Sequence, residues 1–179
     1  MLFDEFAVLL EYPKVAPDQA CDAILRAAAP HPRAAVHLAA FAGAARQMPL
    51  TELQEHYART FDFDAETALY AGHHLFGEEG RRGLLIAGLV ERYRRLDVDA
   101  GTELADHFSP VLRSLARDAD SEEAQELLHL VLRPALAKLM PAVERRSDTY
   151  ATVLQALMLV IDEQTCRSSS LLYSRTSLS

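Results

Sequence analysis

The sequence predicts an all-α, single-domain bundle of about seven to nine helices. Apolar residues recur every three or four positions along most of the chain, as they do on the buried face of an amphipathic helix. No stretch alternates apolar and polar residues as a strand would, and no segment repeats. The 179 residues, half of them hydrophobic, are enough to bury one stable core. We expect a helical domain over residues 1–165 and a frayed or disordered Ser-rich tail over 166–179.

The first half of the chain predicts four helices, each bounded by proline or by a polar turn. The first three are expected over residues 2–12, 17–29 and 33–47. Thr51–Gln54 matches the capping-box pattern, in which a Ser or Thr and a Glu or Gln satisfy the first free amides of a helix. It should open the fourth helix, on which Tyr57 and Phe61 share a face.

The second half predicts a strongly amphipathic helix from Gly83, with Arg92 on its outer, charged face. Ser109 and Pro110 fit the cap and the first residue of a further helix, and Asp120–Glu123 fits the start of the next. Pro134 should kink or divide that helix, because proline removes a hydrogen bond and clashes one turn back. Ser147 or Asp148 should cap the last one.

Composition and charge exclude several classes of function. The formal net charge is −8, which argues against binding nucleic acid, because that binding depends on cationic groups. It suits a basic peptide partner, and it also suits a domain that only needs to stay soluble. No apolar run is long enough to span a bilayer, and the acidic N-terminus does not resemble a signal peptide. We therefore expect a cytoplasmic protein without direct membrane insertion, whose two cysteines are reduced.

Two segments concentrate the residues that are typical of binding sites. Leu69–Gly83 is rich in glycine and charge and contains adjacent histidines, and Glu103–His107 follows a polar loop. The histidines lack a third ligand at zinc-like spacing, and the glycines lack the Lys-Ser/Thr of a phosphate loop. Asp106 and His107 offer acid–base groups without an obvious nucleophile. A hydrolase or nucleotide-dependent enzyme using this loop is therefore the remote alternative.

Leu75 and Phe76 are two large apolar residues inside the polar segment Leu69–Gly83. They either plug the core beneath a loop or line a groove. Composition alone favours the plug. A groove would receive an amphipathic helix from a partner, which is a common mode of peptide recognition by helical domains.

Four motifs in register resemble those of the redox enzyme maturation chaperones. They are Leu9–Pro13, Tyr57–Asp62, His74–Gly83 and Glu103–His107, and the resemblance covers residues 5–162. Within that superfamily the chain is most similar to the nitrate reductase assembly branch, also called the delta subunit branch.

The resemblance implies an all-α, non-enzymatic, cytoplasmic chaperone. Such proteins bind the N-terminal segment of a molybdoenzyme catalytic (alpha) subunit and keep it open until the molybdenum cofactor is inserted. The chaperone itself would hold no stable cofactor and act as a monomer or homodimer, with molybdenum cofactor delivery proteins as further candidate partners. A nitrate reductase is the expected client. The alternative is another enzyme of the DMSO reductase superfamily, with proofreading of its twin-arginine leader.

The resemblance and the residue types together give a set of residues expected to bind the client peptide. Apolar side chains would be buried by the peptide, and acidic ones would meet its positive charges. The set is Tyr57, Phe61, Tyr70, His73, His74, Leu75, Phe76, Glu78, Glu79, Arg82, Glu103, Asp106 and His107.

Overall fold

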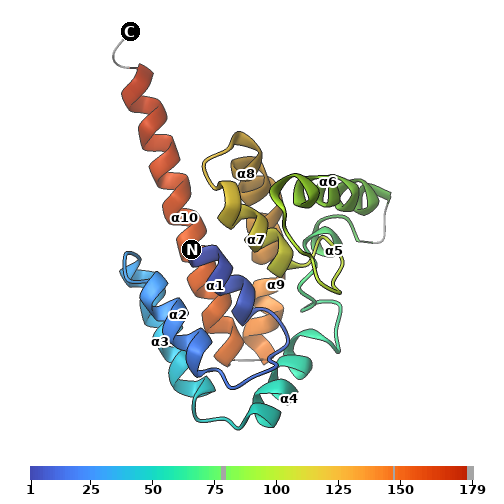
Figure 1. The fold of residues 1–179 in the computed structure, drawn as a ribbon, viewed down its shortest axis with the longest axis vertical. Coiled ribbons are helices and arrows are strands. Elements are labelled where there is room, and N and C mark those ends of the chain that lie inside the picture. The colour runs from blue at the N-terminus through green and yellow to red at the C-terminus, as the bar shows by residue number, and fades with distance from the viewer. Residues whose placement is uncertain (78–79, 147, 177–179) are drawn as a thin grey trace.

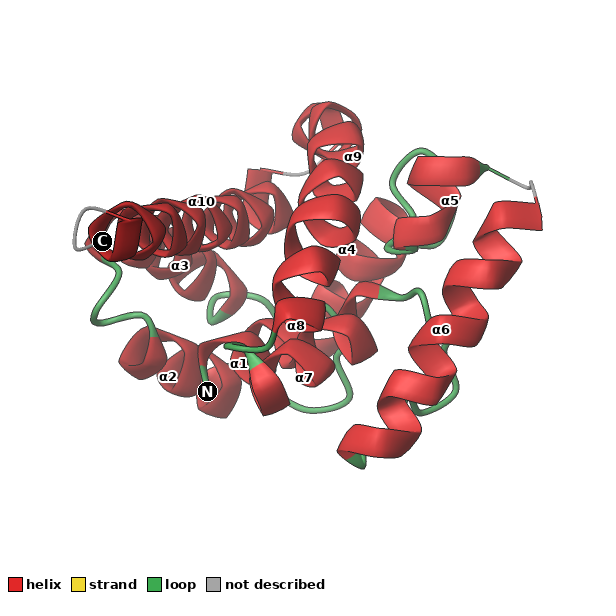
Figure 2. Ribbon diagram, turned by 90° about the horizontal axis from the view of Figure 1, so that it is seen from above, coloured by secondary structure: helices red, strands yellow, loops and turns green. Residues whose placement is uncertain are grey.

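The computed structural model describes the backbone of residues 1–77, 80–146 and 148–176, and the side chains of 1–77, 80–146 and 149–164. Helices and their connecting loops make up this part of the chain, which confirms the all-α, single-domain bundle (Figure 2). The elements are α1 (Leu2–Leu9), α2 (Asp18–Ala27), α3 (Pro32–Ala45), α4 (Leu50–Phe61), α5 (Ala71–Phe76), α6 (Gly80–Leu96), α7 (Phe108–Asp118), α8 (Glu122–Glu126), the π-helical η1 (Leu127–Leu132), α9 (Arg133–Arg146) and α10 (Asp148–Thr176).

The core lies between α1, α3, α7, α9 and α10. Helix α10 packs against α3 and α9, and α1 packs against α2 and α7 (Figure 1). Phe6, Leu10, Phe108 and Leu154 are fully buried there. No helix in the described part of the chain is both long and apolar enough to cross a bilayer.

The C-terminal end of α10 extends away from the other helices (Figure 1). Its backbone is helical as far as Thr176, beyond the point where the sequence favours a tail. The division into a domain over 1–165 and a frayed tail over 166–179 stays a prediction.

Two of the predicted helix starts are wrong and one is confirmed. Pro49 precedes α4 and no side chain caps it, so Thr51 lies inside the first turn and forms no capping box. The N-cap of helix α7 is His107, two residues before the predicted cap at Ser109. Ser121 caps α8 as expected, and its side chain accepts a hydrogen bond from the amide of Ala124. Of the residues proposed to cap the last helix, residue 147 lies outside the described residues.

Pro134 does not divide its helix. Helices α8, η1 and α9 follow one another without a break, so the described residues form nine helical rods. The π-helical stretch Leu127–Leu132 lies directly before Arg133 and Pro134. A wider turn at this place accommodates a proline, which lacks an amide hydrogen and crowds the carbonyl one turn back.

Arg92 is buried, with 2 % of its surface exposed, so its predicted place on the outer face of α6 is wrong. Its Nε donates to Ser114 Oγ at 3.2 Å, and its guanidinium forms ion pairs with Asp118 and, at 3.0 Å, with Glu123. These contacts join α6 to α7 and α8. The charged side chain of Arg92 can face inward because carboxylates on the neighbouring helices neutralise it.

Candidate functional site

The two segments that the sequence singles out lie against each other. An isolated antiparallel bridge pairs Tyr70 with His107. The amide of Ala71 donates to the carbonyl of Asp106 at 2.8 Å, and the amide of Phe108 donates to the carbonyl of Leu69 at 2.8 Å. These two hydrogen bonds fix the start of α5 against the loop that leads into α7.

Asp106 is fully buried and is paired with Arg82 of α6. Arg82 Nε donates to Asp106 Oδ2 at 2.8 Å, and the Arg82 guanidinium lies 5.6 Å from the centre of the Tyr70 ring. Gly72 allows this approach, since a Cβ there would lie 2.7 Å from Asp106 Oδ2. Asp106 and Arg82 therefore hold the loop in place, and the Asp106 carboxylate faces Arg82.

His107 is the N-cap of α7, and its Nδ1 accepts a hydrogen bond from the amide of Ser109 at 3.1 Å. The neutral ring must then carry its proton on Nε2. Burial lowers the pKa of His107, although nearby carboxylates, led by Glu103, oppose the shift. Because Asp106 bonds to Arg82 and Nδ1 faces a backbone amide, the carboxylate does not orient the imidazole. Asp106 and His107 therefore do not form the carboxylate–imidazole pair that a hydrolase using this loop would need.

Tyrosine hydroxyls fix the rest of the loop. Tyr70 donates to Glu103 Oε2 at 2.5 Å, and Tyr93 donates to the carbonyl of Ala105 at 2.6 Å. Burial raises the pKa of Tyr70, and the hydrogen bond to Glu103 raises it further. The hydroxyl therefore remains a donor, and Glu103 is held at the surface beside the buried His107.

A hollow, which we call the acidic hollow, opens beside Glu103 and His107. It consists of an inner cavity of about 210 Å³ and an outer cavity of about 330 Å³, and both are lined by Tyr12, Tyr57, Glu103 and His107. The inner cavity is also lined by Phe61, Asp62, Leu69 and Tyr70. The outer cavity is also lined by Glu11, Lys14, Arg113 and residues 100–102.

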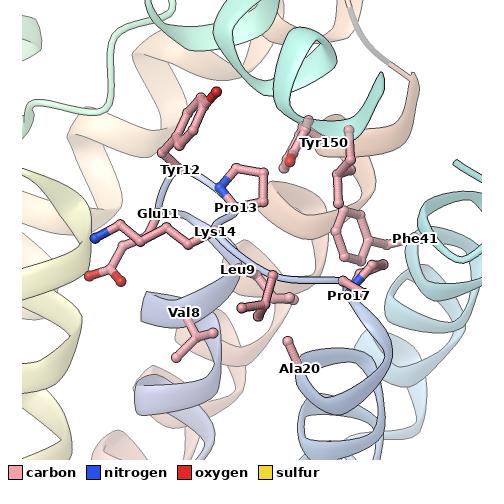
Figure 3. Close-up of a pocket in the computed structure, with 13 residues that line it drawn as sticks. Val8, Leu9, Glu11, Tyr12, Pro13, Lys14, Pro17, Ala20, Phe41 and Tyr150 are labelled. Atoms are coloured by element: carbon pink, nitrogen blue, oxygen red, sulfur yellow. The ribbon is translucent and has the colours of Figure 1, made fainter. Parts of the chain in front are cut away.

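A second cavity, the apolar pocket, continues the acidic hollow along the segment 11–14. It measures about 170 Å³, and Glu11, Tyr12 and Lys14 line both. Figure 3 shows Phe41 and Tyr150 on one side of this segment and Glu11 on the other. The remaining walls are Val8, Leu9, Pro13, Val15, Ala16, Pro17, Ala20 and Leu53.

Sequence reasoning missed the apolar pocket as a site. Leu9–Pro13 is one of the family motifs, but the sequence places its residues at the end of a helix. A signal was present, since Val15 and Tyr12 lie near two prolines in a segment that continues no helix. In the structure Val15 is 71 % exposed and Tyr12 is 45 % exposed.

The structure divides the residues expected to bind the client. Tyr57, Phe61 and Tyr70 line the acidic hollow with Glu103 and His107. His73 and His74 line a separate cavity of about 420 Å³, together with Glu66, Lys138, Arg145 and neighbouring residues. His74 Nε2 bonds to the carbonyl of Ala68 at 2.7 Å, and burial lowers the pKa of His74.

Leu75 and Phe76 lie in the short helix α5, not in a turn as the sequence suggested. Both are half-buried, and Leu75 packs against the core, as the plug interpretation predicts. Gly77 ends the helix with a φ of +60°, which glycine adopts without strain. Glu78 and Glu79 lie outside the described residues. No group of three or more His, Cys, Asp or Glu in the described residues is placed to hold a metal ion.

Comparison with known proteins identifies the family. The model of the nitrate reductase delta subunit family matches residues 25–157. The chain is also 28 % identical over 118 residues to the probable nitrate reductase molybdenum cofactor assembly chaperone NarJ of Bacillus subtilis (strain 168). That match covers 65 % of this chain and 63 % of the relative, which is less than two thirds of its length. The resemblance seen in the sequence motifs is confirmed, and the chain belongs to the nitrate reductase delta subunit family.

Proposed function

We propose that this protein is a chaperone for the assembly of a nitrate reductase-like molybdoenzyme. It binds the N-terminal segment of the catalytic subunit and keeps that subunit competent for insertion of the molybdenum cofactor. The family match and the name of the Bacillus relative support the role in assembly. The observation that carries the peptide-binding step is the apolar pocket that continues into the acidic hollow.

The apolar pocket suits one or two large side chains of an amphipathic segment. Its walls are mainly aliphatic and aromatic, and Val8, Tyr12 and Val15 are partly or largely exposed beside it. Burying a large apolar side chain contributes roughly 1.5–3 kcal/mol before the cost of ordering the peptide. A few such anchors suffice for specific but reversible binding.

Charge complementarity favours a basic segment as the occupant. The chain has a net charge of −8, and Asp62 and Glu103 line the hollow next to the pocket. Opposite charges raise the association rate and select the partner, while each exposed pair adds only about 0–1 kcal/mol.

In this proposal the client, not the chaperone, receives the molybdenum cofactor. The chaperone acts in the cytoplasm as a monomer or homodimer, holds no stable cofactor and catalyses no reaction of its own. Proteins that deliver the cofactor are further partners. A second client class, another enzyme of the DMSO reductase superfamily with a twin-arginine leader, differs only in the peptide that binds.

The test is calorimetric titration with N-terminal peptides from the molybdoenzyme catalytic subunits of one genome. We expect one peptide to bind tightly, and its source identifies the client. Val15→Asp places a charge at the apolar pocket and should weaken binding at least tenfold. Val36→Asp is the matched control, because Val36 is 70 % exposed on α3 and does not line the pocket.

Leu75→Ala with Phe76→Ala tests the other predicted contact. Loss of binding with normal helical content assigns these residues to the client, whereas loss of stability assigns them to the core. If no peptide from any molybdoenzyme binds the folded parent protein, the proposed peptide-binding function is wrong.

A further inference from the structure

The inner cavity of the acidic hollow has aromatic walls. Tyr12 and Tyr57 meet edge to face with ring centres 5.7 Å apart, and Tyr57 and Phe61 do so at 5.1 Å. Tyr70 lines the same cavity. Aromatic faces attract organic cations, and arginine and lysine side chains are the common ones in proteins. The walls therefore suit a flat or extended cationic group better than a small inorganic ion.

Two carboxylates face this cavity, and among the residues that the structure describes no cationic side chain lines it. The carboxylate of Asp62 forms no hydrogen bond or ion pair with any residue that the structure describes, and Glu103 is bonded to the neutral hydroxyl of Tyr70. The cations of the outer cavity are Lys14 and Arg113, and Arg113 is paired with Glu11 at 2.7 Å. The inner cavity thus has negative charge to offer a ligand.

His107 supplies a hydrogen-bond donor beside these carboxylates. Only 4 % of the residue is exposed, and it lines both cavities of the hollow. Its Nδ1 is occupied by the amide of Ser109, so the proton is on Nε2. That Nε2–H has no hydrogen-bond acceptor among the described residues. Nε2 is not among the fully buried side-chain atoms that lack a partner, so it is reached from the hollow, where a ligand can accept its hydrogen bond.

We propose that the acidic hollow binds one arginine or lysine side chain of the client segment. The cationic head lies among the rings of Tyr12, Tyr57 and Tyr70 against Asp62 and Glu103, and a backbone carbonyl of the peptide accepts from His107 Nε2. This inference rests on the proposed function and adds the residue type that the hollow selects. A phosphate or other anion is excluded by the two carboxylates.

The first experiment needs no client. Nα-acetyl-arginine N-methylamide, the lysine equivalent and the neutral citrulline isostere are titrated into the whole protein, and the imidazole nitrogens of His107 are followed by NMR. We expect the arginine or lysine probe to bind at least tenfold more tightly than citrulline and to shift the Nε2 resonance. Equal binding of citrulline overturns the inference, and this comparison uses only the parent protein.

Variants then test whether Asp62 and Glu103 supply the negative charge that selects the cationic probe. Asp62→Asn with Glu103→Gln keeps the shapes of both side chains and should remove the preference for the cationic probe. Glu66→Gln is the control, because Glu66 is an exposed carboxylate outside the hollow. An unchanged preference in the double variant contradicts the proposal.

The client peptide provides a second, separate test. Each basic residue is replaced in turn by citrulline, and one position should lose at least tenfold in affinity in the parent but not in the Asp62→Asn, Glu103→Gln variant. A peptide that binds without any such coupled position overturns this inference and leaves the proposed function intact. If the arginine probe binds but no peptide does, the proposed function is wrong, while the preference of the hollow for a cationic group stands.

Discussion

Two arginines of α6 are bound to carboxylates in opposite ways. Around Arg82 the carboxylate is the buried partner, since the side chain of Asp106 is 0 % exposed and that of Arg82 is 17 % exposed. Around Arg92 the cation is the buried partner, at 2 %, and the carboxylates of Asp118 and Glu123 are 24 % and 46 % exposed. Which partner is buried decides what remains stranded when the other is removed.

The ion pairs of Arg82 and of Arg92 also stabilise different parts of the molecule. Arg82 and Asp106 fix the loop that carries Glu103 and His107 to the acidic hollow. Arg92 joins α6 to α7 and α8 and lines neither the hollow nor the apolar pocket. One pair therefore serves the site and the packing together, and the other serves the packing alone.

Arg82→Met should have the largest effect. It leaves the Asp106 carboxylate buried without a cation, which lowers the free energy of unfolding by about 3–5 kcal/mol. The loop then loses its anchor, so peptide affinity falls as well. Urea denaturation and calorimetry measure the two effects, and adding Asp106→Asn should restore part of the stability. A smaller loss than that of Arg92→Met would refute the comparison.

Arg92→Met should lower the free energy of unfolding by about 1.5–3 kcal/mol, the range for hydrogen bonds to charged groups. Water can solvate the partly exposed Asp118 and Glu123 after the guanidinium is gone. Peptide affinity should stay within twofold of the parent value. Arg94→Met is the control, because the Arg94–Glu91 pair is exposed and contributes about 0–1 kcal/mol.

Gly72→Ala tests how closely α5 approaches the Arg82–Asp106 pair. The new Cβ would lie 2.7 Å from Asp106 Oδ2 and 2.8 Å from Arg82 Cγ, so we expect a loss of about 1–3 kcal/mol. Gly88→Ala in α6 meets nothing within 4 Å and should gain about 0.5–1 kcal/mol. Thermal unfolding compares them, and two gains would show that α5 moves away freely.

The pH dependence of stability tests the cap of α7. Because burial lowers the folded-state pKa of His107 below its unfolded value of about 6.5, the unfolded chain binds the proton more readily. The contribution of His107 to the free energy of unfolding is complete above about pH 6.5 and is lost as the pH falls towards the folded-state pKa. His107→Asn keeps an acceptor for the amide of Ser109 and should flatten this part of the pH profile. The residual slope reports His74, whose pKa is also lowered.

Local patterns in the sequence predict much of the fold. The helical periodicity and the cap at Ser121 depend on neighbours within four residues, and both are found. The capping box predicted at Thr51 is wrong, because the motif does not reveal that Pro49 is the N-cap of α4.

The error at Arg92 concerns contacts between distant residues. The sequence places Arg92 on the surface because charged side chains are usually solvated, but its partners lie 22 to 31 positions away. Arg82 and Asp106 pair with each other across 24 positions, which the sequence does not reveal, and their contact with the client stays a prediction. The sequence singles out the two segments that contain Tyr70 and His107, but it does not predict that these two residues pair. Nothing local reveals which charges neutralise each other.

We expect the bridge between Tyr70 and His107 to separate parts of the chain that open independently. It ties together the two ends of the excursion that contains α5 and α6, and α6 packs mainly against α5 and α7. Segments with few tertiary contacts exchange their amide hydrogens through local opening, without global unfolding. The amides of α6 should therefore exchange earlier than those of α3 and α10, and protection should rise sharply at Ala71 and Phe108. The acidic hollow lies at the border of this segment. We therefore expect a ligand bound there to raise the protection of the amides at this border first.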